Sequence, residues 1–590
     1  MSRLSLPQFK EWNPQLVREF KGRFQVRNIL IAIGISILSQ VILFFSTFDK
    51  FPGMEKITIS SGYCTSKNQL YYKYEQQYWK IQDQLNDFYF TGDRSVLEQQ
   101  LKTLEKLKNS YCPQDLIDFN RWFTDYWANI FIWISVLAVF SLIVVGTYML
   151  INDLATEERR GTLNFIRLSP QSAQSILIGK LLGVPILLYL GVFLTIPLHL
   201  WAGISAHISL LEIFSFYGLT LASCAFFYSL ALLIGVTTST WLHGLQSWLG
   251  SGITLIFLLT ANSKPITSDG YDWLNIFSPT CLLRYLIDQT GDHYLNYPFN
   301  HANISQLQWF GLNVGTNGVS LLALALLNYG FLTYWIWQAL KRNYHHPNLP
   351  SLSKKQSYLL TLNFTLMSLG FILSKFETNN SYYVGIFIGN IFLILGLISA
   401  LSPQRQTLQD WVRYRRERKK HWWMDLGKDL IWGEKSPATV AILINLLIAS
   451  TIWIITIFLV AKPTEKGEML LAIALHCSFM LLCASIAQLM AMMKTPKRTL
   501  WATSSVLGVL IVPLLFIFVM FSYKSEYYSP FVWSVFSFFS ISSVPLSSIL
   551  ISFVGQGLMI ILCNLQLTRL LKKAGESELK ALVRNEKGIT

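Results

Sequence analysis

The chain has 590 residues, of which 52% are hydrophobic and only 14% are charged, and its mean hydropathy is +0.39. A soluble domain carries about 25% charged residues, and the apolar residues here are gathered in long blocks, so the composition excludes a soluble globular protein. The formal charge of +15 is typical of basic cytoplasmic segments. Because the sequence contains no soluble domain in which basic and aromatic residues would together line a groove, nucleic acid is not an expected partner.

The apolar blocks predict an all-α polytopic membrane protein whose immediate partner is the lipid bilayer. A membrane-spanning helix needs about 20 apolar residues, and the blocks do not show the alternation of about 10-residue β-barrel segments. We expect about twelve spans, at 28–48, 127–151, 176–200, 209–236, 243–261, 312–340, 356–375, 382–402, 438–461, 468–493, 499–521 and 540–568.

Lysine and arginine gather in four segments between or beyond the predicted spans. They are the N-terminal 10–27, the links 341–355 and 403–437, and the C-terminal 572–580. Cytoplasmic loops are enriched in these residues, and an even number of spans places all four segments on one side. We therefore expect cytoplasmic N- and C-termini and two loops on the outside, at 49–126 and 262–311.

The outer loop 49–126 has the pattern of a helical hairpin. Ser95 and Glu98 form a capping box for its second helix, and the turn 91–94 precedes that helix. The hairpin would bring Cys64 and Cys112 together, where an extracytoplasmic location permits a disulfide. Two unpaired thiols are the alternative.

The chain divides into two related halves in its pattern of elements. An amphipathic helix rich in aromatic and charged residues precedes both the first and the ninth span. We accordingly divide the chain into a first membrane domain, 1–345, two connecting spans, 346–402, and a second membrane half, 403–590, with the form of a degenerate repeat. Ordinary membrane flanks would give a similar pattern.

The residues that carry covalent or ion-coupled chemistry are missing from the sequence. The predicted spans contain almost no charged residues, which argues against an ion-coupled carrier. There is no phosphate-binding loop, zinc-ligand spacing or nucleophile elbow, so we expect no catalytic residues, no metal site and no cofactor bound by this chain. A membrane enzyme acting on lipid-linked substrates remains an alternative, with Asp288, Asp292 and His293 as its candidate cluster.

A charged, structured segment at 156–170 connects the second and third predicted spans. Glu157 and Glu158 suit the start of a short helix, Leu163 and Ile166 share one helical face, and Gly161 permits a sharp turn. Ser169 and Pro170 have the pattern of a cap and first residue of the next helix. Such an element suits a groove in a soluble partner, or it anchors the loop at the membrane surface.

This segment resembles the cytoplasmic loop of type-2 ABC transporter permeases. The string Glu157-Glu158-Arg159-Arg160-Gly161-Thr162-Leu163, then Leu168-Ser169-Pro170 and Gly179-Lys180, is similar to that family's Glu-Arg/Lys-x-x-Gly-Thr-Leu-Glu, Ser-Pro and Gly-Lys pattern. The six spans to about 340 agree with the resemblance, and 341–590 has no second copy of the loop.

The resemblance implies a permease subunit of an ATP-driven transporter, with an exporter as the expected direction, in a bacterial plasma (inner) membrane. The partner would be a separate ABC ATP-binding subunit that holds ATP and Mg²⁺, and a second permease chain would complete a homodimer or heterodimer. The implied ATPase-coupling residues are Glu157, Glu158, Arg159, Gly161, Thr162, Leu163, Ile166, Ser169 and Pro170, with Leu163 and Ile166 filling the partner's groove. The implied interfacial helix carries Trp12, Arg18, Glu19 and Phe20.

Overall fold

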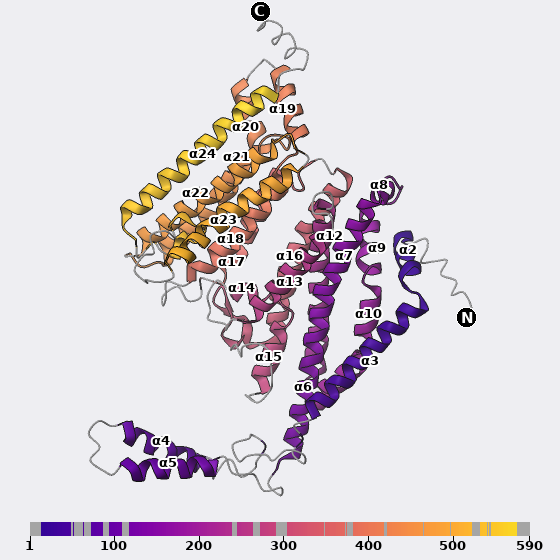
Figure 1. Ribbon diagram of the computed structural model, residues 1–590, viewed down its shortest axis with the longest axis vertical. Coiled ribbons are helices and arrows are strands. Elements are labelled where there is room, and N and C mark those ends of the chain that lie inside the picture. The colour runs from indigo at the N-terminus through magenta and orange to yellow at the C-terminus, as the bar shows by residue number, and fades with distance from the viewer. Residues whose placement is uncertain are drawn as a thin grey trace, which may run out of the picture.

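A computed structural model shows an almost wholly helical chain (Figure 1). It describes residues 13–48, 51, 63, 72–86, 94–108, 117–238, 245–263, 272–290, 304–346, 349–371, 373, 382–417, 422–463, 465–495, 497–521, 532–539, 541 and 544–574. Within these residues the strands are the short antiparallel pair β1 (Gln308–Trp309) and β2 (Leu312–Asn313).

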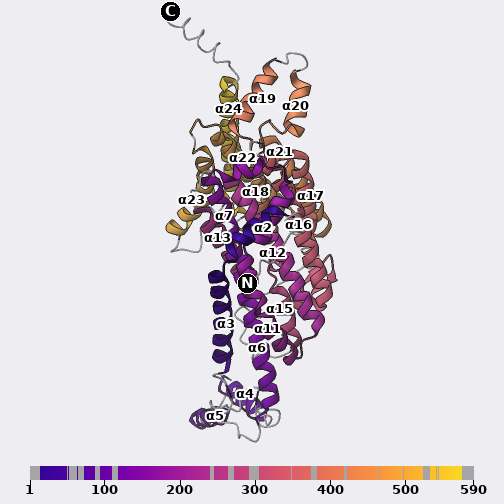
Figure 2. The same cartoon turned by 90° about the vertical axis from the view of Figure 1, so that its right-hand side faces the viewer.

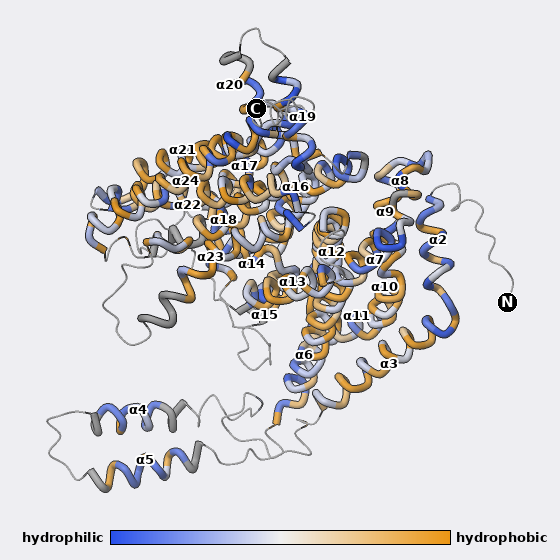
Figure 3. Tube along the Cα trace, turned by 45° about the horizontal axis from the view of Figure 1, so that its top comes forward, coloured by the Kyte–Doolittle hydropathy of each residue, from blue (hydrophilic) through white to orange (hydrophobic). Residues whose placement is uncertain are grey.

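Nine helices in the described residues are long and apolar enough to cross a membrane, and a bent pair raises the number to ten. The nine are Val26–Phe48, Phe119–Arg159, Ile186–Ser205, Leu210–Thr238, Gly318–Tyr344, Thr439–Val460, Lys466–Ala491, Arg498–Leu515 and Leu546–Ala574. The chain is therefore an all-α, multi-pass membrane protein, and apolar residues dominate its long helices (Figure 3).

Three of the twelve predicted spans are not among these nine helices, so the count of twelve stays a prediction. The predicted span 243–261 forms α13 (Leu245–Ser263), which carries several buried polar residues. The span 356–375 forms α17 (Lys354–Leu369), whose 16 residues fall short of the about 20 that a crossing takes. The span 382–402 forms α18 (Tyr382–Leu401), which bends by 64° into α19 (Arg405–Glu417).

The third predicted span is broken at its prolines into three helices. They are α9 (Ala173–Gly183), α10 (Ile186–Phe193) and α11 (Ile196–Ser205). Pro185 and Pro197 stand at the two breaks, where a proline lacks the backbone N–H that would continue the ladder. The first break leaves α9 as a separate short helix at the end of the bundle that carries the loop 156–170 (Figure 1).

The second span is one long helix that passes through a π-helical turn. It consists of α6 (Phe119–Phe140), the π turn η3 (Ser141–Val145) and α7 (Gly146–Arg159). The hydroxyl of Tyr228 donates to the carbonyl oxygen of Leu142 at 2.7 Å, so a carbonyl in the irregular turn keeps a partner. Gly146 lets the Tyr228 ring approach, because a Cβ there would overlap its hydroxyl.

The first bundle packs around this long helix. Helix α7 lies against α12 (Leu210–Thr238) and α13, and α12 lies against α16 (Gly318–His345). Helix α3 (Val26–Phe48) contacts α6 and α10. The short segment α14 (Asp272–Asn275), α15 (Cys281–Thr290) and the 3-10 turn η4 (Ile304–Gln306) folds back onto the same core.

The second bundle contains the last four long helices together with α17 and α18. Helices α21 (Thr439–Val460), α22 (Lys466–Ala491), α23 (Arg498–Phe521) and α24 (Leu546–Ala574) pack through α22. Helix α17 contacts α21, and α18 contacts both α21 and α22. The segment predicted as two connecting spans is therefore packed with the second half (Figure 2).

Two further pairs of helices lie in segments where the sequence predicts helices. Helix α2 (Pro14–Arg23) precedes α3, and α20 (Trp422–Trp432) precedes α21, which is the order in which the two halves were expected to begin. Helices α4 (Tyr72–Asn86) and α5 (Arg94–Lys108) lie side by side at the end of the molecule opposite to α19 and the last turns of α24 (Figure 1). Cys64 and Cys112, and with them the predicted disulfide, lie outside the described residues.

A buried lysine joins α17 to the chain around α20. The Nζ atom of Lys354 donates to the carbonyl oxygen of Leu430 at 2.7 Å, to the hydroxyl of Ser436 at 2.6 Å and to the carbonyl of Pro437 at 3.3 Å. These acceptors lie at the end of α20 and in the link to α21. Burial lowers the pKa of Lys354 to about 8, and the carboxylate of Asp429 opposes part of that effect.

The lowered pKa makes stability depend on pH in a defined window. Because the unfolded chain binds this proton more tightly, the contribution of Lys354 to the free energy of unfolding rises from about pH 8 to its ordinary pKa of 10.5. We expect the Lys354→Met variant to show a smaller rise than the wild type in thermal unfolding scans of the detergent-solubilised protein between pH 7.5 and about pH 10. An identical slope in both proteins would contradict this assignment.

Candidate functional site

The predicted coupling segment forms a tight helix–turn–helix at the end of the second span. Helix α7 ends at Arg159, and Gly161 adopts a φ of 71°, in the left-handed region that glycine occupies without strain. The hydroxyl of Thr162 donates to the carbonyl oxygen of Glu157 at 3.1 Å, which closes the turn. The short helix α8 (Thr162–Arg167) follows at once.

The buried and the exposed face of α8 are the reverse of those expected from the sequence. Leu163 is fully buried and Ile166 is 6% exposed, both in the core of the first bundle. Phe165 on α8 and Leu168, which directly follows its last residue Arg167, are 79% and 85% exposed. This placement corrects the expectation that Leu163 and Ile166 fill a partner's groove: in this structure they attach α8 to the chain's own core, and the other pair faces outward.

The start of the next helix also differs from the prediction. Helix α9 begins at Ala173, and the hydroxyl of Ser172 caps it by accepting from the backbone N–H of Ser175 at 3.2 Å. Ser169 and Pro170 lie in the bend before it. The cap is therefore Ser172 and not Ser169, because the chain needs three more residues to turn from α8 into the direction of α9.

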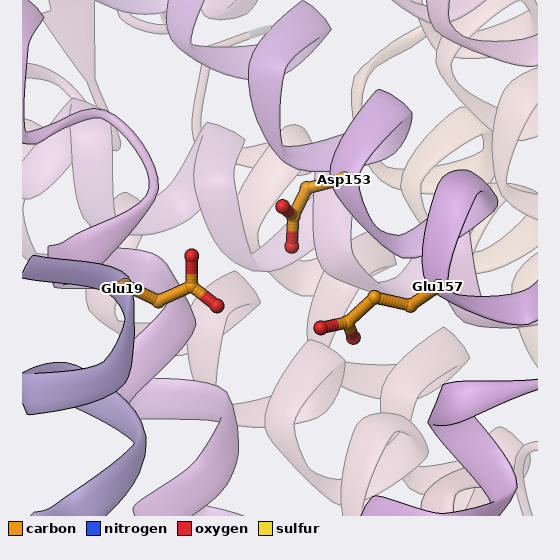
Figure 4. A group of neighbouring side chains, drawn as sticks. All are labelled: Glu19, Asp153 and Glu157. Atoms are coloured by element: carbon orange, nitrogen blue, oxygen red, sulfur yellow. The ribbon is translucent and has the colours of Figure 1, made fainter. Parts of the chain in front are cut away.

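A buried lysine lies directly behind this segment. Lys180 of α9 is fully buried, and its Nζ atom lies 2.7 Å from Asp153 Oδ2 and 2.7 Å from Glu157 Oε2, both on α7. It also lies 3.6 Å from Oε1 of Glu19 on α2. Figure 4 shows the three carboxylates converging from two separate helices.

The three carboxylates have the spacing of a cation site, since one oxygen from each lies within 4.8 Å of the others. In this structure the ammonium group of Lys180 lies where they converge and supplies the positive charge. A buried charge is tolerated only when it is paired and hydrogen-bonded, so each of these four residues depends on the others.

Two arginines of α2 complete the cluster. Arg18 donates to Glu157 Oε1 at 2.7 Å, and Arg23 pairs with Asp153 and, at 3.2 Å, with Glu19. The cluster thus contains three carboxylates and three cations and is electrically balanced. Arg18 has a half-exposed side chain, so its pair contributes less than the buried contacts of Lys180.

Helix α2 is held against α9 by close backbone packing as well as by charge. Asn13 caps α2 by accepting from the N–H of Leu16 at 3.0 Å and donates to the carbonyl oxygen of Ser175 at 2.7 Å. Gly179 and Gly183 permit this contact, because a Cβ at Gly179 would lie 2.7 Å from Asn13 Oδ1 and one at Gly183 would lie 2.6 Å from Glu19 Cβ. Small residues four apart on a helix permit close approach of a neighbouring helix, and here that neighbour is α2.

The remaining predicted residues lie around the cluster in different ways. Arg159 is exposed and donates to Thr156 and to the carbonyl of Ala155, Glu158 is half-buried, and Phe20 packs against Phe24. Trp12 lies outside the described residues, as do Asp292, His293 and the side chain of Asp288.

Several residues that connect the segment 156–170 to α2 and α9 were not predicted from the sequence. Asp153, Lys180 and Arg23 belong to the cluster, and Phe165 and Leu168 form the exposed face of α8. One signal was available: a lysine inside the apolar run that begins near 176 must find a carboxylate partner when it is buried. Acids at Asp153 and Glu157 are four residues apart and share a helical face.

Two of the histidines inside the predicted spans have ordinary helix-packing partners. His199 lies 2.6 Å from the hydroxyl of Ser135 and 2.8 Å from that of Tyr217, and His476 lies 3.0 Å from Asn390 Oδ1. Hydrogen bonds of this kind join helices in membranes, so the contacts are those expected of packing residues.

A comparison of the chain with protein-family models, with curated proteins and with solved structures finds no match in any of the three.

The close contact between α2 and α9 gives a first test of this site. We expect Gly179→Ala with Gly183→Ala to lower the free energy of unfolding by about 1–3 kcal/mol, as overpacking does, because both new Cβ atoms would overlap α2. The matched control is Gly191→Ala in α10, where a Cβ meets nothing within 4 Å. Equal melting temperatures for the double variant and the control would contradict the contact.

The charge cluster gives a second test through a double-mutant cycle. We expect Lys180→Met alone to cost about 3–5 kcal/mol of stability, since it leaves buried carboxylates unpaired. Adding Glu157→Gln removes one of those charges, so the double variant should be less destabilised than the sum of the single changes. If the losses of unfolding free energy in the two single variants simply add in the double variant, the cluster is contradicted. The control is Lys21→Met, at an exposed lysine of α2, whose free energy of unfolding should stay within about 0.5 kcal/mol of the wild type.

Proposed function

We propose that this chain is the membrane permease subunit of an ATP-driven transporter, and that a separate ABC-type ATP-binding subunit docks on α8. The observation that carries the proposal is the exposed apolar pair Phe165 and Leu168 on a short helix that is otherwise fixed to the chain's core. An exposed apolar surface held in one orientation suits a groove of a partner protein.

The connections of α8 support a coupling role. Helix α8 follows α7 through the turn at Gly161 and is anchored by Leu163, and α7 continues the 41-residue helix Phe119–Arg159. The Lys180 cluster joins α7 to α9 and α2. A displacement of α8 by a partner would therefore be passed to several spans together, since a packed and ion-paired unit does not deform continuously.

The exposed polar residues beside α8 suit the rim of such an interface. Arg159 and Arg160 are exposed at the end of α7, and Glu158 is half-buried. Charged residues at an interface rim contribute to specificity and association rate more than to affinity. In this proposal Phe165 and Leu168 provide the apolar centre of the contact, and the partner binds ATP and Mg²⁺.

The orientation of the proposed transporter follows from its charges. Helix α8, the arginine-rich α19 and the lysine-bearing end of α24 lie toward one end of the molecule, and α4 and α5 lie at the other (Figure 1). The positive-inside rule assigns the first end to the cytoplasm. We infer that both termini are cytoplasmic, that α4 and α5 form an outer hairpin, and that the chain is a bacterial inner-membrane exporter that pairs with a second permease chain.

The docking face is tested by polar substitution of its two apolar residues. We expect Phe165→Ser and Leu168→Ser each to weaken binding of a co-expressed ABC-type ATP-binding subunit about ten- to a hundred-fold, because each loses about 1.5–3 kcal/mol of apolar burial. The measurement is the amount of ATPase that co-purifies with the chain, together with ATP hydrolysis by the complex in vesicles.

The matched control is Trp79→Ser, which removes another exposed aromatic residue on α4. This variant should bind the ATPase as the wild type does. Undiminished association of the Phe165→Ser, Leu168→Ser double variant would overturn the proposal for α8.

A further inference from the structure

One continuous face of α24 changes from apolar to basic along its length. Residues that recur at intervals of three and four lie on one face of a helix. The apolar residues of this face are all 53–63% exposed; they are Ile551, Val554, Leu558, Ile561, Leu562 and Leu565. The same spacing then gives Arg569, Lys572 and Lys573, which are exposed as well. Helix α24 lies at the edge of the second bundle (Figure 1), so this face is turned away from the other helices.

The opposite face of α24 holds its last turns in position. Leu567 is buried with Leu408 of α19 and Met492 at the end of α22 in a small apolar cluster. Leu570 and Leu571 pack against the same cluster. The three cations therefore belong to a packed part of the helix and keep a fixed orientation.

These three cations have no carboxylate partner in the part of the chain that the structure describes. Other cations at this end of the second bundle are paired within the chain. Arg415 of α19 lies 2.7 Å from a carboxylate oxygen of Asp429, and Arg342 pairs with Glu434. Because positive charge without a local counter-charge attracts anions, the cations of α24 are available to an external anionic group.

The change from apolar to basic residues lies at the depth of the lipid headgroups. Arg569 is 23 residues after Leu546, the first residue of α24, which corresponds to about 34 Å at a rise of 1.5 Å per residue. The apolar core of a bilayer is about 30 Å thick. The cations therefore lie just beyond the acyl chains, where the phosphates of the lipids are found.

We propose that this face of α24 binds an anionic phospholipid. Its acyl chains lie along the apolar residues from Ile551 to Leu565, and its phosphate and headgroup lie against Arg569, Lys572 and Lys573. Each lysine or arginine near an anionic lipid surface is attracted to it, and salt screens that attraction. A zwitterionic lipid contacts the same apolar residues but brings no net charge, so the cations select the anionic headgroup.

The apolar part of the face favours a lipid over a soluble acidic protein. A soluble partner would reach the three cations, but it would not contact residues at the depth of the acyl chains. A phospholipid matches both parts of the face, and in the same order along the helix. This binding does not require that an ATPase dock on α8.

The experiment compares two photoactivatable lipids that differ only in the headgroup, a phosphatidylglycerol and a phosphatidylcholine with the same diazirine-bearing chains. Each is added in trace amount to the purified full chain in phosphatidylcholine vesicles. Mass spectrometry quantifies labelling of α24 relative to α12, whose 29 residues include no lysine or arginine. We expect phosphatidylglycerol to label α24 about five-fold more than phosphatidylcholine at low salt, as about 1 kcal/mol of attraction gives. In 1 M salt, where the screening length is about 3 Å, this ratio should fall toward one.

A triple variant tests whether the three cations carry the preference. Neutralising them in Arg569→Gln, Lys572→Gln, Lys573→Gln should reduce labelling by phosphatidylglycerol to the level of phosphatidylcholine. Equal labelling of α24 by the two lipids in the wild type would overturn the proposal and leave a soluble acidic partner for the cations. A preference that persists in the triple variant would overturn it as well.

A matched control separates a binding site from diffuse surface charge. It removes the same number of charges at exposed lysines of the second half outside α24, in Lys428→Gln, Lys435→Gln, Lys497→Gln. This variant should keep most of the five-fold preference of α24 for phosphatidylglycerol. An equal loss of the preference in both triple variants would contradict a site on α24 and indicate a general attraction to this end of the molecule.

Discussion

The ion cluster around Lys180 is the interaction on which the arrangement of the first bundle depends. A fully buried ammonium group is unfavourable in a protein interior unless carboxylates surround it. Asp153 and Glu157 come from α7 and Glu19 from α2, so neutralising Lys180 requires that three helices meet at one point. Gly179 and Gly183 make that meeting geometrically feasible. Charge and close packing therefore specify the same contact, which neither would specify alone.

This contact also explains how a six-residue helix can be held in a fixed orientation. Helix α8 is too short to be stable by itself, but it follows directly from α7 and inserts Leu163 into the core. Its outer face, Phe165 and Leu168, is then fixed relative to the second span and to α9. The proposed docking of an ATPase depends on this property, because a mobile loop would not pass a displacement to the spans.

The membrane class, the positions of most long apolar helices and the turn within 156–170 could be predicted from the sequence, because these depend on local hydropathy and on glycine and proline. The sequence could not select the outer face of α8: Leu163 with Ile166 and Phe165 with Leu168 are both apolar pairs three residues apart, and only tertiary packing distinguishes them. The Arg18–Glu157 pair joins residues 139 positions apart, which no local pattern contains.

The central claim is that α2, α7, α8 and α9 move as one unit fastened by Lys180. It is tested most directly by the distance between spin labels at Lys21 on α2 and Arg160 beside α8, both exposed, measured by pulsed electron paramagnetic resonance in the reconstituted protein. We predict one narrow distance distribution in the wild type, which stays unchanged when the proposed ATP-binding subunit hydrolyses ATP and which broadens in Lys180→Met. A distribution that is already broad in the wild type, or one that Lys180→Met leaves narrow, would contradict the account.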